Sequence, residues 1–484
     1  MTPSPIIVWF RQDLRLEDNP ALAEAAASGR PVVPLFVLDD GDETRPLGGA
    51  AKWWLNRSLT ALAGSLAARG SRLILRRGDP AEIVEAMASE IGAEAIHWNR
   101  LYDSASVARD SALKMSLAGR SVTVRSFNAA LLNEPWTVKT GQGGGFKVFT
   151  PYWRAARERL GRVETAPSPL GLALSDAWPE SEGITAWRLH PSSPDWSAGL
   201  NVWTPGEVGA GARLEAFLDH VLDGYAEARD RPALGAGSHL SPHLHWGEIG
   251  PRQIWNRAHA HVHAEGRGER DLDKFLAELG WREFNHQLLF HHSDLPTANF
   301  RAGFDSFPWR DDPGAFAAWS RGETGYPIVD AGMRELWATG FMHNRVRMIV
   351  ASFLTKDLMI DWRAGEAWFW DTLVDADLAS NVTNWQWVAG CGADAAPYFR
   401  IFNPTAQGER FDPDGAYVRR WLPELAALPT AVIHQPWTAP PAMLAMAGVR
   451  LGATYPRPIV DHGDARKRAL AAYAGLKSSG EDPA

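Results

Sequence analysis

Residues 375–404 read DADLASNVTNWQWVAGCGADAAPYFRIFNP, a stretch that combines acids, amides and tryptophans within a few helical turns. Asp375, Asp377 and Asn381 lie close enough along the chain to present two carboxylates and an amide to one polar ligand. Hydrogen-bonding groups of this kind, next to aromatic side chains, suit a buried planar cofactor. The stretch therefore predicts a cofactor-binding core in this part of the chain.

The aromatic side chains in question are Trp385 and Trp387, which supply large planar surfaces. A second interpretation of the same residues stays open. The acids can pair with Arg345 or Arg347 in an ordinary core helix whose tryptophans only fill space. The residues alone do not choose between a redox cofactor site and a well-packed core.

The same stretch resembles the flavin-binding core of the DNA photolyase/cryptochrome family. Upstream, residues 319–362 read WSRGETGYPIVDAGMRELWATGFMHNRVRMIVASFLTKDLMIDW and resemble that family's signature, and the similarity continues through NPTAQGERFDPDGAYVRRWLPEL at 403–425. Residues 6–22, IIVWFRQDLRLEDNPAL, agree with it at the other end of the chain. The resemblance implies an FAD enzyme close to the class I-like bacterial photolyases that split cyclobutane pyrimidine dimers.

Length and composition place limits on this expectation. A chain of 484 residues is long enough for two or three domains with sizeable cores. The formal net charge of -8 gives no general attraction to phosphate, so any DNA contact must come from a local basic patch. The single cysteine, Cys391, excludes an intramolecular disulfide and fits a reducing cytosol. Without a signal peptide or an apolar run of spanning length, the sequence predicts a cytoplasmic protein outside the membrane.

Residues 1–130 alternate strand and helix patterns. Short apolar or β-branched runs occur at 6–10, 32–38, 72–75, 95–98 and 122–124. Asn19 before Pro20 and Asp79 before Pro80 are start signals for two of the intervening helices. The spacing predicts a doubly wound, Rossmann-like parallel sheet with helices on both faces. The glycine run at 141–145 lacks the ending of a P-loop and indicates a flexible turn.

The remainder of the chain divides into a connector and a helical domain. Residues 131–204 are rich in proline in their second half and lack sustained periodicity, which indicates a long interdomain connector. From 205 to 484 helical spacing dominates, with apolar residues three and four apart at 213–222, 272–290, 331–337, 343–354 and 368–373. The predicted fold class is thus an α/β domain joined by a long linker to an all-α domain that, by the resemblance, binds FAD.

One short segment offers hydroxyl and backbone donors for a phosphate. Residues 237–241 read GSHLS, follow Tyr225 and precede a proline at a helix start, an arrangement that can hold a pyrophosphate. An ordinary helix start is the alternative interpretation. The resemblance implies that FAD phosphates bind here, although Gly237 and His239 replace the threonine and arginine usual in the family. The expected contacts are Tyr225, Gly237, Ser238, His239, Leu240 and Ser241.

Two helical faces carry further candidates. Glu278, Trp281 and Arg282 stand three or four residues apart and therefore share a face, as do Asn344 and Met348. Amphipathic surface helices with ion pairs would explain both from the residues alone. Both clusters match positions that line the substrate cavity of photolyases.

The resemblance implies a role for each matched residue. Glu278 would bond the thymine edge, and Trp281 and Trp387 would form an aromatic wedge. Arg347 would pair with Asp375 beneath the flavin. The full DNA-binding set is Arg229, Glu278, Trp281, Asn344, Arg345, Met348, Trp387 and Gln407. The cofactor set beyond the phosphate segment is Arg282, Arg347, Asp375, Asp377 and Asn381.

The implied chemistry is light-driven electron transfer without a metal. Reduced FAD would donate an electron to a pyrimidine dimer flipped out of the duplex, the ring would open, and the electron would return. Asn381 would face flavin N5, where an amide supplies no proton readily. Trp385, Trp362 and Trp309 match the family's electron relay in order from flavin to surface. The catalytic set is therefore Glu278, Asn381 and these three tryptophans.

Three other functions stay open on the sequence. A cryptochrome-like photoreceptor would use the same cofactor, but Asn381, Glu278, Met348 and the short end after residue 462 favour repair. A (6-4) photolyase would carry histidines where this chain has Asn344 and Met348, because its lesion needs acid catalysis. An electron-transfer flavoprotein of similar fold would not need the lesion-cavity residues.

The resemblance also implies partners. Damaged DNA is the expected one, and the chain is expected to act as a monomer without a protein partner. A light-harvesting chromophore in the parallel-sheet domain is left open: it could be methenyltetrahydrofolate, 8-hydroxy-5-deazaflavin or another flavin, or it could be absent. Folate binders often carry adjacent Asn and Glu where this chain has Ala105 and Ser106, so the residues do not identify the chromophore.

Overall fold

The computed structural model describes residues 3–41, 44–175, 178–394 and 399–478. Residues 395–398 of the stretch at 375–404, and the end of the chain from 479, lie outside the described residues. The chain divides into two compact units. Unit 1 comprises Met1–Asp223 and Ser238–Ser293, and unit 2 comprises Gly224–Gly237 and Asp294–Ala484.

Unit 1 contains a five-stranded parallel sheet in the order β3-β2-β1-β4-β5. The strands are β1 (Ile6–Phe10), β2 (Val32–Leu38), β3 (Ile74–Arg77), β4 (Ala95–Asn99) and β5 (Thr123–Phe127). Ile6 of β1 is paired with Val32 of β2 and with Ala95 of β4. The order reverses between β1 and β4, so the sheet is doubly wound, as the sequence predicted.

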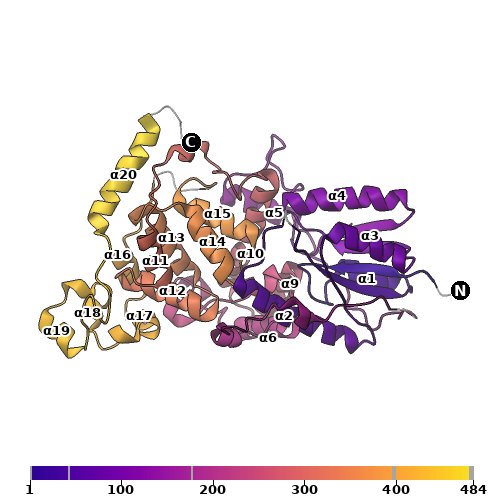
Figure 1. Ribbon diagram of the computed structural model, residues 1–484, viewed down its shortest axis with the longest axis horizontal. Coiled ribbons are helices and arrows are strands. Elements are labelled where there is room, and N and C mark those ends of the chain that lie inside the picture. The colour runs from indigo at the N-terminus through magenta and orange to yellow at the C-terminus, as the bar shows by residue number, and fades with distance from the viewer. Residues whose placement is uncertain (1–2, 42–43, 176–177, 395–398, 479–484) are drawn as a thin grey trace. The chain divides into compact units, whose positions relative to one another are not determined.

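Burial along the strands follows their place in the sheet. β1, β2 and β4 are buried at every residue, while the edge strands β3 and β5 are partly exposed. Strands buried on both faces read as continuous apolar runs, and this explains IIVWF and VVPLFVL. Helices α3 (Pro80–Glu90) and α4 (Ser104–Gly119) lie together over one face (Figure 1), where Val84 and Leu113 join the core. Helix α1 (Pro20–Ala27) contacts β1 and β4.

Both predicted helix starts are confirmed. The Asn19 side chain accepts a hydrogen bond from the amide of Leu22 at 3.1 Å, and Asp79 accepts one from Glu82 at 2.9 Å. A proline follows each cap at the first helical position, where its missing N–H costs nothing. These local signals place the helices that pack against the sheet.

Unit 1 extends beyond the sheet into helices that the sequence assigned elsewhere. The stretch 131–204, predicted to be a connector, includes an 11-residue helix, α5 (Phe149–Arg159). Three helices beyond the predicted domain limit at 205 group with the sheet by contact: α6 (Glu207–His220), α9 (Pro251–Glu265) and α10 (Glu269–His291). The predicted limits of 130 and 204 therefore do not coincide with the compact units, and they stay a prediction. The helices of unit 1 not yet given are α2 (Gly49–Ala67), α8 (Ser241–His245) and the short turns η1 (Ile184–Trp187) and η2 (Ser197–Val202).

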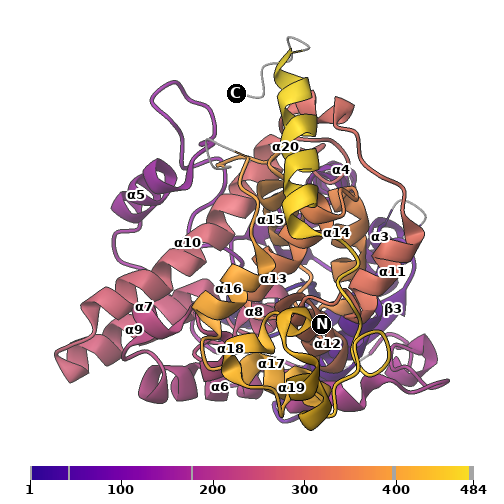
Figure 2. The same ribbon diagram turned by 90° about the vertical axis from the view of Figure 1, so that its left-hand side faces the viewer.

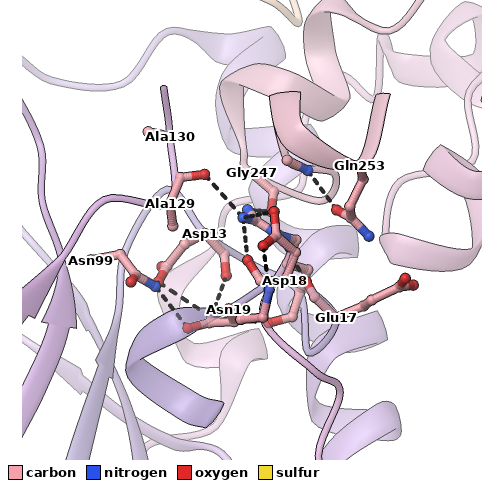
Figure 3. A network of polar contacts seen from close by, with 12 residues as sticks. Asp13, Glu17, Asp18, Asn19, Asn99, Ala129, Ala130, Gly247 and Gln253 are labelled. Carbon is pink, nitrogen blue, oxygen red and sulfur yellow. Dashed lines mark hydrogen bonds and ion pairs between the residues drawn. The ribbon is translucent and has the colours of Figure 1, made fainter. Parts of the chain in front are cut away.

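Arg15, in the loop after β1, ties three distant segments of unit 1 together. Its guanidinium donates to the carbonyls of Glu17 (2.9 Å), Asp18 (2.6 Å), Ala129 (3.0 Å) and Gly247 (2.9 Å). Figure 3 shows these carbonyl-bearing residues converging on one point. Since Gly247 directly follows the turn after α8, this network holds that turn beside the loop that follows β1.

Side chains of helix α10 form hydrogen bonds with the segment after β5 in a similar way. The Glu283 carboxylate accepts hydrogen bonds from the amides of Leu132 and Asn133, each at 2.9 Å. The neighbouring Arg282 donates to the carbonyl of Ala130 at 2.6 Å. Arg282 was predicted from the sequence as a cofactor ligand, and at least one of its N–H groups serves this internal contact.

Glu283 gives unit 1 a measurable pH dependence. Burial raises the pKa of this carboxyl from 4.5 to about 7. Because folding raises this pKa, protonated Glu283 contributes to the free energy of unfolding. The contribution is fully present below pH 4.5 and is lost as the pH rises through 7. The free energy of unfolding changes by about 3 kcal/mol at most. Urea midpoints measured across this range should fall with pH more steeply in the wild type than in Glu283→Gln, which has no proton to release. Parallel pH curves for the two proteins would contradict this assignment.

Unit 2 is helical in its described part, apart from an isolated bridge between Leu451 and Tyr455. Helices α14 and α15 pack side by side (Figure 2). The elements are α7 (Tyr225–Ala228), η3 (Pro232–Leu234), η4 (Ala302–Ser306), α11 (Pro313–Arg321), α12 (Pro327–Thr339), α13 (Asn344–Ser352), η5 (Phe353–Asp357), α14 (Trp362–Thr372), α15 (Leu378–Ala389), α16 (Pro404–Phe411), α17 (Ala416–Trp421), η6 (Pro423–Leu425), α18 (Thr430–Ile433), η7 (Pro436–Thr438), α19 (Pro441–Met446) and α20 (His462–Ser478).

The helix predicted at 343–354 ends at Ser352 and continues as η5, a π-helical turn. Within it, the fully buried Lys356 donates from Nζ to the carbonyl of Ala389 at 2.7 Å. Burial lowers the pKa of this amine well below its ordinary value. The contact fixes the end of α15, the helix that carries most of the candidate site in unit 2.

Candidate functional site

The start of α15 presents a carboxylate and an oriented amide. Asp377 caps this helix by accepting a hydrogen bond from the amide of Ser380 at 2.8 Å. One turn later, the Asn381 amide nitrogen donates both to the carbonyl of Glu366 (3.0 Å) and to its carboxylate (2.8 Å). Because both N–H groups are directed at α14, Asn381 offers its Oδ1 as an acceptor to any other partner.

Arg347 and Asp375 form the ion pair expected from the sequence. Nη2 of Arg347 lies 3.1 and 2.9 Å from the two carboxylate oxygens of Asp375, whose side chain is only 3% exposed. The Arg347 Nε donates to the carbonyl of Met342 at 2.7 Å. The alternative partner, Arg345, instead pairs with Asp230 at 2.9 Å.

The three tryptophans of the predicted relay differ in burial. Trp385 and Trp362 are buried at 3% and 0% exposure, whereas Trp309 is partly exposed, as expected if Trp309 is the member of the path that meets solvent. In the described part of the chain, no two of these rings are in contact. The nearest rings to Trp385 are Phe369 at 5.0 Å and Trp319 at 6.2 Å. The relay therefore stays a prediction.

Neighbouring side chains fix the two buried tryptophans. The indole nitrogen of Trp362 donates to Asn299 at 2.9 Å, and the guanidinium of Arg363 lies 4.7 Å from its ring centroid. The Trp385 ring lies against Gly365, where a Cβ would be 2.1 Å from the ring. A side chain at position 365 would therefore displace Trp385 or separate α14 from α15.

Arg345 organises a second polar area of unit 2. Besides its ion pair with Asp230, its guanidinium lies 4.4 Å from the Phe411 ring centroid and 3.8 Å from the Met348 sulfur. Asn344 is exposed at the start of α13. Asn344 and Met348 thus stand four residues apart on α13, the spacing that places them on one face, and Arg345 contacts Met348.

The remaining predicted residues of unit 2 lie on other elements. Tyr225 is buried at the start of α7, and the Arg229 guanidinium lies 5.5 Å from its ring. Gly237 ends the segment 224–237. Gln407 is partly buried on α16. The Trp387 indole donates to the carbonyl of Asp394 at 2.9 Å.

In unit 1, α10 carries Glu278, Trp281 and Arg282 in the spacing that places them on one face. A contact that the sequence analysis missed lies beside them. The Phe149 ring stacks on Trp281 with a centroid distance of 3.8 Å and an interplanar angle of 7°. The two residues lie 132 positions apart, so no local pattern indicated this pair.

The segment 238–241 runs into α8, which begins at Ser241. Ser238 Oγ accepts from the amide of Leu240 at 3.4 Å, and Leu240 is buried. His239 has a left-handed backbone with φ of 53°, a conformation that costs free energy in residues other than glycine. Its ring lies 5.9 Å from Trp203. The position where His239 replaces the arginine usual in the family therefore also has an unusual backbone conformation, within the predicted phosphate segment.

Within the described residues, no group of three or more His, Cys, Asp or Glu is arranged to hold a metal ion. None of the described helices has the length and apolar character required to cross a membrane.

Comparisons with known proteins identify the family. Residues 6–170 match the family model described as DNA photolyase, and residues 275–475 match the FAD binding domain of DNA photolyase. The chain is 52% identical to the deoxyribodipyrimidine photo-lyase of Agrobacterium fabrum, over 98% of this chain and 99% of the relative. The chain belongs to the DNA photolyase family.

Cryptochromes are among its relatives too. Cryptochrome-1 of Arabidopsis thaliana is 40% identical over 96% of this chain and 69% of that protein. Among solved structures, a bacterial class III photolyase from Agrobacterium tumefaciens superimposes with a TM-score of 0.95 at 53% identity, covering 99% of this chain and 98% of that one. The parallel sheet and the helical FAD-binding region of this chain therefore have the fold of a photolyase.

The side chains of unit 2 fit the FAD expected in this family. The polar edge of an isoalloxazine ring offers an N–H donor and carbonyl acceptors, which require a carboxylate or amide oxygen and a cationic donor. Asp375, Arg347 and the Oδ1 of Asn381 supply these groups. The aromatic Trp385, one turn after Asn381, matches the planar ring system in kind.

Proposed function

We propose that the protein is a deoxyribodipyrimidine photo-lyase that splits cyclobutane pyrimidine dimers in DNA under light. The observation that carries this proposal is the similarity to a photo-lyase over 98% of the chain. The Asn381 amide supports it, because its N–H groups are engaged by Glu366 and leave an acceptor at Oδ1. A neutral amide does not readily release a proton, which favours repair over signalling.

In the proposed enzyme, the contacts to FAD are those that the family resemblance implies. Asp375, Asp377, Asn381 and Arg347 hold the flavin end, and Tyr225 with the segment 237–241 holds the phosphates. Reduced FAD, when bound, supplies the light-driven electron that opens the dimer. Arg347 fixes the orientation of the Asp375 carboxylate, so that this acceptor does not rotate away from a ring N–H.

The proposed lesion contacts divide by chemistry. Glu278 hydrogen-bonds the base edge, and Trp281 and Trp387 stack on the bases. Asn344, Arg345 and Met348 line the floor of the lesion site. Arg229 and Gln407 contact the DNA backbone, which positions the strand without reading its sequence.

Repair of a defined thymine dimer in an oligonucleotide tests the proposal. Purified, chemically prereduced protein should restore the two thymines under blue light and leave the dimer intact in darkness. Glu278→Ala should lower the repair rate about tenfold, the size expected for loss of a hydrogen bond to a buried group, while FAD stays bound. Loss of FAD from this variant would contradict the role proposed for Glu278.

A cryptochrome-like photoreceptor is the second candidate, because the Arabidopsis cryptochrome is 40% identical over nearly the whole chain. A protein that binds and photoreduces FAD but leaves both cyclobutane dimers and (6-4) photoproducts intact would belong to this class. Repair of (6-4) photoproducts alone would show that Asn344 and Met348 do not exclude that lesion.

Within the family, we propose class III in place of the class I-like subclass expected from the sequence. The support is the similarity to the Agrobacterium structure described as class III. We also propose that the enzyme acts in the cytoplasm as a monomer on damaged DNA, in keeping with its single, buried cysteine. A methenyltetrahydrofolate or 8-hydroxy-5-deazaflavin antenna in the parallel-sheet domain stays a prediction, which absorbance of the purified protein tests.

A further inference from the structure

Helix α5 begins with an aromatic stack that reaches the predicted lesion face of α10. Phe149 lies parallel to Trp281 at 3.8 Å, and Trp153, one turn later, lies parallel to Phe149 at 6.5 Å. Phe284 meets Trp281 edge-on at 5.9 Å. With one face covered by Phe149 and one edge held by Phe284, the Trp281 ring has a fixed orientation and a single face left for a base.

The loop before α5 is anchored to the same helix. Gly145 passes so close to α10 that a Cβ would lie 2.6 Å from Gln287 and 2.7 Å from His291. The amide of Phe146 donates to the Gln287 side chain at 3.1 Å. Phe149 and the loop are therefore both positioned by packing on α10, the helix that carries Trp281.

This region is basic in an otherwise acidic protein. Residues 139–162 contain one acidic residue, Glu158, in a chain whose net charge is -8. The basic residues of the same range are Lys139, Lys147, Arg154, Arg157, Arg159 and Arg162. Lys139 and Arg154 are exposed, and neither has an ion-pair partner in the part of the chain that the structure describes. A local basic surface of this kind attracts phosphate even though the whole protein does not.

We propose that residues 139–159 form a further DNA-contact surface, in which Phe149 orients Trp281 for stacking and Lys139 and Arg154 bind phosphates beside the lesion. The inference rests on the proposed repair function and adds to it two roles that the family resemblance did not supply. Phe149 is a positioning residue, since it acts through Trp281. Lys139 and Arg154 bind any duplex, damaged or not, because phosphate contacts carry no sequence information.

Two kinds of variant separate these roles. Phe149→Ala should weaken binding to a dimer-containing duplex about tenfold and leave binding to the undamaged duplex unchanged. A tenfold loss lies within the range of about 1–3 kcal/mol that one base stack contributes. Phe149→Tyr keeps the ring and should restore affinity. Lys139→Ala and Arg154→Ala should weaken binding to both duplexes and reduce the salt slope of log K by about 0.9 for each lost phosphate contact.

Lys52→Ala is the matched control, because it removes an equal charge from the exposed side of α2. It should leave the salt slope unchanged. Equal salt slopes for Lys52→Ala and Arg154→Ala would overturn the phosphate contacts, and equal selectivity for damaged DNA in the wild type and Phe149→Ala would overturn the positioning role. Absence of selective binding by the wild type would instead contradict the repair function itself. Thermal unfolding of each variant identifies any loss of affinity that comes from misfolding.

Discussion

Replacing Trp362 with phenylalanine should nearly abolish light-driven reduction of oxidised FAD and spare repair by chemically prereduced enzyme. A phenyl ring is much harder to oxidise than an indole, so a relay that passes through this fully buried position would be interrupted. Absorbance of the flavin under blue light with an external reductant measures the first activity, and dimer repair measures the second. The change also leaves the Asn299 oxygen without its 2.9 Å donor, at a cost of about 1–3 kcal/mol in stability.

Trp319→Phe is the control for this experiment. Trp319 is fully buried, donates its indole N–H to the carbonyl of Val350 at 3.0 Å, and lies 6.2 Å from Trp385. Trp319→Phe therefore removes an indole N–H donor from a similarly buried environment, at a position outside the predicted relay. If Trp319→Phe blocks photoreduction and Trp362→Phe does not, electrons reach Trp385 through its ring contact with Trp319 and the predicted order is wrong. Equal loss of repair in both variants would indicate structural damage.

The sequence predicted the elements whose signals are local. Continuous apolar runs gave β1 and β2 at their observed bounds, since central strands of a parallel sheet bury both faces. The caps Asn19 and Asp79 gave the starts of α1 and α3. The spacing of Glu278, Trp281 and Arg282 gave their common face on α10. In each case the information lies within a few residues of the element it specifies.

The remaining features depend on contacts between distant residues. Helix α5 lay in a stretch read as a connector, because its buried residues, Tyr152, Trp153 and Ala156, form too short a pattern to stand out. The bond from Arg282 to Ala130 joins residues 152 positions apart. The grouping of α6, α9 and α10 with the sheet depends on many such contacts, so no composition change marks the limit between the units.

Removing the Arg347 side chain should release FAD more completely than any other single change proposed for unit 2. The guanidinium pairs with both oxygens of Asp375, whose side chain is 3% exposed. Breaking a buried pair by removing one partner typically costs about 3–5 kcal/mol, because the other charge loses its compensation. At this site the cost falls on the structure that binds the flavin, so Arg347→Ala should lower FAD affinity by roughly a hundredfold or more. Equilibrium rebinding of FAD to the apoprotein measures this loss.

Two variants decide how Arg347 acts. Arg345→Ala removes the same side chain two residues earlier, where the partner Asp230 is 40% exposed, and should leave FAD affinity nearly unchanged while weakening DNA binding. Combining Arg347→Ala with Asp375→Asn removes both charges and should recover apoprotein stability, because no buried carboxylate is left without its cation. If FAD affinity recovers with stability, the ion pair only supports the fold. If stability recovers and FAD still does not bind, the two charged groups hold the cofactor themselves, as the flavin-binding assignment requires.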